Sequence, residues 1–125
     1  MNVVFWVVQA LLALGFLMAG FMKLTQPIAM LSKRLPWTSA LPAWQVRGIG
    51  LAEVLGALGL ILPGATGIAP TLTVAAAVGL LMVMVGAVVF HGVRHEGAQA
   101  IVGPLVLGVL ALVIVVGRLA IAPLA

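Results

Sequence analysis

Four long apolar runs, separated by short polar breaks, dominate this sequence. They cover residues 3–22, 46–62, 68–90 and 98–120, to within a few positions. A helix rises about 1.5 Å per residue, so about 20 residues cross the roughly 30 Å hydrocarbon core of a bilayer. Backbone polar groups inside lipid must be satisfied within their own segment, so each run is predicted to be a helix. The expected fold is all-α, a transmembrane four-helix bundle in which residues 1–125 form a single domain.

Charged residues are too scarce for a water-soluble globule. Only 6% of the 125 residues are charged and 65% are hydrophobic, whereas a soluble domain has about 25% charged residues. The net charge of +4 arises because Glu53 and Glu96 are the only acidic residues, and six Lys and Arg are too few for a nucleic-acid surface. We therefore expect a lipid bilayer as the surrounding partner, and no nucleic acid. The absence of Cys excludes disulfides, thiolate metal sites and dithiol redox chemistry.

The segment between the first two runs, residues 23–45, differs from them in composition. It contains three Pro, two Trp and the basic pair Lys33–Arg34. Pro interrupts a continuous helix and Trp favours the headgroup level, so the segment is predicted to be an interfacial loop. Two alternatives stay open for residues 28–35: a short helix lying in the plane of the interface, or an irregular loop.

Basic residues gather at one end of the predicted bundle. Four crossings place both termini on one face, and the connections 23–45 and 91–97 on the other. That other face carries five of the six Lys and Arg residues: Lys23, Lys33, Arg34, Arg47 and Arg94. The positive-inside rule then places these two loops in the cytoplasm and both termini outside, and we expect a bacterial inner membrane.

Small residues recur at four-residue spacing in three of the predicted helices. They are Gly15, Ala19, Gly48, Ala52, Gly56, Ala75 and Gly79. Such a pattern lets helix backbones approach closely where no hydrophobic effect draws the helices together. It predicts packing within the bundle, with dimerisation as the alternative, so a homo-oligomer stays open.

Glu53 is the residue that most needs an explanation, because it lies about seven residues inside the second run, or about 10 Å from its polar end. An ionised carboxylate at that depth costs several kcal/mol unless it is paired or faces water. The helix ends on the same face carry Lys23, Arg47 and His91. We predict that these four side chains converge on one polar site that opens toward the cytoplasm. Proximity favours Arg47 as the neutralising partner, although it must bend inward to reach the carboxylate.

Each of the four residues also has a structural interpretation. Lys23 and Arg47 can extend to the headgroups, and His91 can be an ordinary histidine at the border of a loop. Glu53 can hold two helices together through a buried ion pair. An intramembrane ionisable group is nevertheless a functional hypothesis by default.

The remaining histidine and glutamate, His95 and Glu96, are expected to be solvated loop residues. Two His and two Glu are too few for a di-iron carboxylate site. We therefore expect no metal.

Two motifs of the chain stand out from generic apolar sequence. The first, AGFMKL at residues 19–24, closes the first run, and the second, RGIGLAEVLGALGLILP at residues 47–63, forms the second. Together with His91 they resemble the DoxX-like family of small four-helix integral membrane proteins. In that family the shared polar positions would fall on the four residues of the predicted polar site. The resemblance implies links to thiosulfate:quinone oxidoreduction, to oxidative-stress complexes or to assembly, and it implies no particular reaction.

Two functions follow as hypotheses. The preferred one is binding of a small lipophilic ligand, a quinone or a lipid, beside Glu53, or service as an accessory subunit of a membrane redox complex. A quinone is the one candidate cofactor. The alternative is an intramembrane acid–base enzyme, isomerase-like, in which Glu53 is the general acid or base. One carboxylate without a clear partner base is thin evidence for catalysis, and no pair of broken helices indicates a transporter.

Overall fold

The computed structural model describes residues 1–124, with the side chains of all but Arg34 and Ser39. Within that range five α-helices follow one another: α1 (Asn2–Thr25), α2 (Ile28–Arg34), α3 (Ala43–Thr66), α4 (Leu72–Val93) and α5 (Ala98–Val116). A 3-10 helix, η1 (Pro36–Ala40), follows α2, and a π-helical turn, η2 (Gly117–Ile121), continues α5. Four of the helices, α1, α3, α4 and α5 with η2, are long and apolar enough to cross a membrane. The prediction of an all-α, four-helix transmembrane fold is confirmed.

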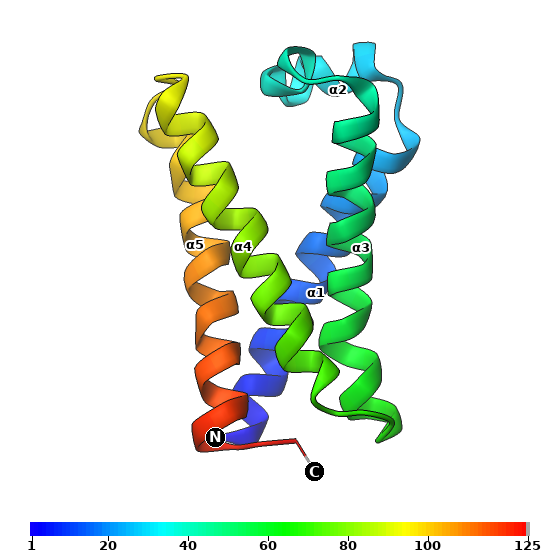
Figure 1. Cartoon of the computed structure of the whole chain (residues 1–125), viewed down its shortest axis with the longest axis vertical. Helices are drawn as coiled ribbons and strands as arrows, with labels where there is room; N and C mark the ends of the chain where they lie inside the picture. Colours follow the sequence, from blue (N-terminus) through cyan, green and yellow to red (C-terminus); the bar gives the residue numbers. More distant parts are fainter. Residues whose placement is uncertain (125) are drawn as a thin grey trace.

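The four long helices form two pairs, which meet at one end of the bundle and separate toward the other (Figure 1). α1 packs along α3, α4 packs along α5, and contacts between α3 and α4 join the pairs. Both termini lie at the end where the pairs meet, whereas α2 and the α4–α5 turn lie at the opposite end. The basic residues of the helix ends near α2 are therefore remote from the termini.

Large apolar side chains cover the outside of the bundle as well as its interior. Phe16, Leu60 and Ile114 are fully buried, while Val3 and Met82 leave 73% and 68% of their surface exposed. A continuous apolar exterior of this kind is unfavourable in water and requires lipid around it. The chain is therefore a multi-pass membrane protein.

α3 continues through Pro63, where we predicted that the second span would end. Proline has no N–H to donate to the carbonyl of Gly59, one turn earlier. The Thr73 hydroxyl of α4 donates to that carbonyl instead, at 2.9 Å. The helix ends only at Gly67, whose φ of +74° is the left-handed conformation that glycine adopts without strain. A contact between helices thus offsets the missing backbone hydrogen bond and lengthens the span.

The segment after α1 is more regular than a loop. α1 itself extends to Thr25, and residues 28–34 form the short helix α2, so the irregular-loop alternative is wrong. Leu31 anchors α2 because its side chain is fully buried, whereas Trp44 at the start of α3 is 72% exposed. At the other end of the bundle the α3–α4 turn runs on, and α4 begins at Leu72 rather than at residue 68.

α1 and α3 come into backbone contact where Gly20 faces Gly50. A Cβ atom on Gly20 would lie 2.6 Å from the carbonyl oxygen of Gly50, and one on Gly50 would lie 2.8 Å from Cβ of Lys23. Only glycine fits at this crossing. Lys23 and Glu53 each follow one of these glycines by three residues, on the same helix face. The close approach therefore determines how near those two side chains can come.

Most of the predicted small residues lie away from the contacts between helices. Ala52 and Ala75 are exposed, and space is open at the Cβ positions of Gly15, Gly48 and Gly79. Among the glycines of that set only Gly56 meets another helix closely, at Leu80. The spacing was correct for a helix face, but that face is mostly turned outward or toward an open groove between α3 and α4, which Ala52, Gly56 and Gly79 help to line. The close approach of α1 and α3 uses glycines outside the stripe. Self-association through the outward face stays a prediction.

Gly50→Ala is expected to destabilise the protein by about 1–3 kcal/mol, because the added methyl forces α1 and α3 apart. Gly48→Ala, two residues earlier in the same helix and facing open space, is the matched control. It is expected to be neutral or stabilising by up to about 1 kcal/mol, since alanine is the better helix former. Equilibrium unfolding in a non-ionic detergent measures both. Equal losses in the two variants would contradict the glycine crossing.

Candidate functional site

Lys23 and Glu53 form an ion pair buried between α1 and α3. Nζ of Lys23 lies 2.5 Å from Oε1 of Glu53. The two residues expose only 8% and 2% of their surface. Because the pair lies inside the bundle, each charge depends on the other for the stabilisation that water would otherwise give. The intramembrane carboxylate is thus neutralised by the last turn of the first span.

Arg47, which we expected to neutralise Glu53, has a different partner. Its Nη1 donates to the carbonyl oxygens of Lys23 and Gln26, both at 2.6 Å. The last carbonyls of a helix lack partners within the helix and carry partial negative charge, so a guanidinium is well placed there. Six residues separate Arg47 from Glu53, which turns the two side chains to different faces of α3. Arg47 therefore fastens the end of α1 to α3 and leaves the carboxylate to Lys23.

Trp37 of η1 connects the ion pair with the end of α4. Nζ of Lys23 lies 5.6 Å from the centre of the Trp37 ring, a cation–π distance. The same ring meets Phe90 and His91 edge to face, with centroids 6.2 and 5.9 Å apart. Trp37 thus lies between the two helix pairs at the end where they separate. The sequence indicated a headgroup anchor at Trp37 and gave no sign of this bridging position.

His91 ends α4 in a second polar group. Its Nδ1 lies 2.9 Å from Oε2 of Glu96, and Nε of Arg94 donates to the same oxygen at 2.9 Å. Glu96, expected to be simply solvated, therefore ties the α4–α5 turn together. The hydrogen bond with His91, followed by the one from Arg94, lowers the pKa of the Glu96 carboxyl below its ordinary value. His91 itself is only 6% exposed.

The four predicted site residues thus lie in one region but do not all meet. Lys23 and Glu53 are in direct contact, and His91 is reached from Lys23 through the Trp37 ring. Arg47 donates instead to backbone carbonyls at the end of α1. The site is therefore a buried ion pair of Lys23 and Glu53 next to the rings of Trp37 and His91.

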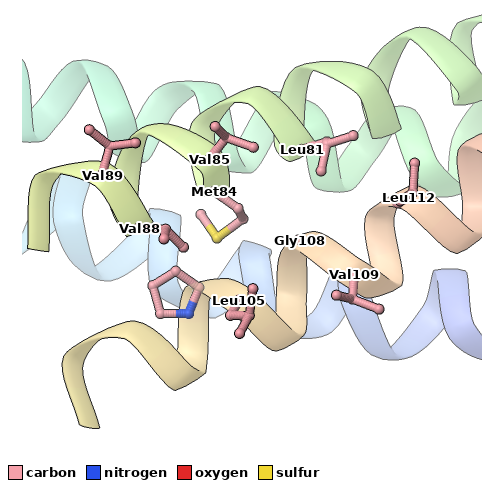
Figure 2. Close-up of a pocket in the computed structure, with 10 residues that line it drawn as sticks. Leu81, Met84, Val85, Val88, Val89, Leu105, Gly108, Val109 and Leu112 are labelled. Carbon is pink, nitrogen blue, oxygen red and sulfur yellow. The ribbon is translucent and has the colours of Figure 1, made fainter. Parts of the chain in front are cut away.

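An apolar groove runs along the seam between α4 and α5 (Figure 2). It encloses about 210 Å³. Its walls are Leu81, Met84, Val85, Val88 and Val89 of α4 with Pro104, Leu105, Gly108, Val109 and Leu112 of α5. Val88 precedes His91 by three residues and so lies on the same helix face. The α4 wall of the groove therefore ends within one helical turn of His91.

A second polar cluster, at the end that holds the termini, escaped the sequence interpretation. Gln9 is fully buried and its Nε2 donates to the carbonyl of Leu60 at 2.6 Å, which links α1 to α3. Nε of Arg118 donates to Oε1 of Gln9, also at 2.6 Å. The available indication was simple: Gln9 is the one polar residue that interrupts the first apolar run, and Arg118 is the one basic residue of the fourth.

These features define a small integral membrane protein of four spans with an ion pair inside one end of its bundle. The DoxX-like family matches residues 7–114, and the chain belongs to that family. The resemblance carried by the two motifs is thereby confirmed. Comparison with curated proteins and with solved structures gave no match.

The Lys23–Glu53 pair predicts a strong double-mutant coupling. Lys23→Met and Glu53→Leu should each destabilise the protein by about 3–5 kcal/mol, because each leaves one buried charge without its partner. The double variant K23M/E53L should recover most of that loss, since it removes both charges. Equilibrium unfolding in detergent gives the three free energies. Additive losses would show that the two side chains do not interact.

The contacts of Glu96 predict an acid-dependent change at Trp37. In the unfolded chain the Glu96 carboxyl has a pKa near 4.5, and folding lowers it. The stabilisation of the folded protein by the ionised Glu96 carboxylate is therefore complete above about pH 4.5. It is lost as the pH falls through the lower pKa of the folded state. Glu96 bonds to His91, and the His91 ring contacts Trp37. In a variant with Phe in place of Trp6 and Trp44, the emission of Trp37 should therefore shift over that acid range. Glu96→Gln should abolish the shift, and its persistence in that variant would assign the change to another group.

Proposed function

We propose that the protein binds a small amphiphilic molecule, a quinone or a lipid. Its polar head would lie beside Lys23, Trp37 and His91, and its tail along the α4–α5 groove. The observation that carries the proposal is the close grouping of a buried cation, an aromatic ring and an imidazole, with an apolar groove whose α4 wall ends within one helical turn of that imidazole. Ligand sites between helices combine a mostly apolar lining with a few convergent polar groups in this way.

The polar end offers suitable donors. Lys23 has three N–H groups, and its hydrogen bond to Glu53 uses one of them. A quinone carbonyl or a lipid oxygen near the Trp37 ring could accept another. Trp37 supplies a flat apolar face against which a ring or a headgroup can pack.

The energetic balance of the ion pair also supports a binding role. A buried salt bridge is weak evidence for stability, because apolar residues of similar volume often hold a fold as well or better. The contact between α1 and α3 has its own support in the glycine crossing and in the hydrogen bonds of Arg47 to the end of α1. A lysine at this position is therefore better explained by a ligand than by helix packing.

An acid–base role for Glu53 has less support. Its carboxylate is 2% exposed and bonded to Lys23, so a substrate would have to displace that lysine to reach it. Supply of a bound quinone to a membrane redox complex, as an accessory subunit, is compatible with the binding proposal and rests on it.

The proposed orientation places this site in the cytoplasmic leaflet of a bacterial inner membrane. Four of the basic residues, Lys23, Lys33, Arg47 and Arg94, belong to elements at the end with α2, while Arg118 lies with the termini. By the positive-inside rule the end with α2 faces the cytoplasm and both termini face outward.

Decylubiquinone titrated into the detergent-solubilised protein tests the proposal. It should raise the melting temperature and quench Trp37 in a variant with Phe at positions 6 and 44. K23M/E53L, expected to remain folded, should lose the response, and Glu53→Gln should weaken it.

Two variants of α5 test the groove. Val109 lines it and Val106 does not, although both are about half exposed. Val109→Phe should weaken binding roughly tenfold, equivalent to about 1.4 kcal/mol, and Val106→Phe should leave it unchanged. A wild-type protein that responds neither to decylubiquinone nor to a phospholipid of similar chain length, in melting temperature or in fluorescence, would refute the proposed function.

A further inference from the structure

Arg118 is a buried cation at the opposite end of the bundle from the Lys23–Glu53 pair. It lies in η2 and exposes only 2% of its surface. Its Nε donates to Gln9 at 2.6 Å, and its Nη1 donates to Oδ1 of Asn2 at 2.6 Å and to the carbonyl of Ala122 at 2.9 Å. All three acceptors are neutral, so none of them supplies a counter-charge.

No acidic side chain of the protein is available to Arg118. Glu53 and Glu96 are the only two in the sequence, and both bond to basic residues near the end with α2. Two aromatic rings flank the guanidinium, with the centroids of Phe5 and Trp6 each 5.5 Å from its central carbon. Ring faces attract a cation but do not neutralise it.

One donor of this guanidinium is unused. Nη2 of Arg118 is enclosed and has no acceptor among residues 1–124. A buried N–H donor without an acceptor is unfavourable, and more so on a charged group. Arginine offers a planar fork of donors that fits two oxygens of a phosphate or a carboxylate at once. A single oxyanion would thus supply both the counter-charge of the guanidinium and the acceptor that Nη2 lacks.

The depth of the group indicates where such an anion comes from. The guanidinium bonds to Asn2 and Gln9, which are seven residues, or about 10 Å, apart along the first turns of α1. It therefore lies within one to two turns of the membrane surface, where lipid phosphates are found. Val3, Val7 and Leu119 near it are exposed and apolar, as residues that face lipid are.

We propose that Arg118 binds a phosphate-type oxyanion through Nη1 and Nη2, with the phosphate of a phospholipid headgroup as the favoured source. The anion would take the place of the Ala122 carbonyl on Nη1, while Gln9 and Asn2 keep the guanidinium in position. Trp6, beside the guanidinium, reports on the occupied site. This site is independent of the one assigned to the amphiphile, which lies at the other end of the bundle.

The test uses the full chain, delipidated in non-ionic detergent. A C-terminal affinity tag keeps any chain-terminal carboxylate remote from the site. Phe at positions 37 and 44 leaves Trp6 as the fluorophore. Phosphatidylglycerol, a diacylglycerol with the same chains and inorganic phosphate are titrated separately. We expect phosphatidylglycerol to change Trp6 emission saturably and the diacylglycerol to have no effect. Inorganic phosphate acting alone at comparable concentration would support the oxyanion site and identify a free anion as its source.

Two variants make the assignment specific. Arg118→Gln should weaken the phosphatidylglycerol response at least tenfold, and Lys33→Gln, an exposed cation at the other end of the bundle, should leave it unchanged. Equal responses to phosphatidylglycerol and diacylglycerol, with none to inorganic phosphate, would overturn the proposal. So would a folded R118Q that binds as tightly as the parent. The lipid comparison uses intact Arg118, so it remains decisive if R118Q does not fold.

Discussion

The contact between the Lys23 ammonium and the Glu53 carboxylate is the interaction that sets the constraints on the end of the bundle near α2. Two charges inside a membrane protein are tolerable only as partners, and they can be partners only if α1 and α3 nearly touch. The glycine crossing at Gly20 and Gly50 provides that proximity, one turn from the pair on each helix. Arg47, by bonding the last carbonyls of α1, keeps the end of that helix at α3.

The buried cations at the two ends of the bundle are stabilised by different kinds of partner. Near α2 the Lys23 ammonium is paired with the Glu53 carboxylate, and the Trp37 ring contacts both Lys23 and His91. Near the termini the contacts of Arg118 within residues 1–124 are to neutral acceptors and aromatic rings. The two acidic side chains of the sequence, Glu53 and Glu96, both bond to basic residues near α2, so neither neutralises this second cation. The lipid is therefore solvent for most of the surface and, by our proposal, a specific partner at Arg118.

Sequence reasoning succeeded where one constraint acts alone. Run length against bilayer thickness predicted the four spans, and the topology of helix ends brought Lys23 and His91 to the region of Glu53. It failed where two constraints compete. Pro63 should end a helix, yet Thr73 from another helix satisfies the carbonyl that proline leaves free. Arg47 is nearer to Glu53 in sequence than Lys23 is, yet helical geometry turns it to the α1 carbonyls. The outward or inward direction of a small-residue stripe depends on helix rotation, which spacing does not encode.

A dipolar-coupling measurement by solid-state NMR in lipid bilayers tests the ion pair most directly. With ¹⁵Nζ-labelled lysine and ¹³Cδ-labelled glutamate, the chain has only Lys23, Lys33, Glu53 and Glu96 to observe. The structure predicts one short nitrogen–carbon contact, lost in Glu53→Gln and kept in Glu96→Gln. A spectrum without that contact, or one in which it survives Glu53→Gln, would contradict the buried pair and the binding site built on it.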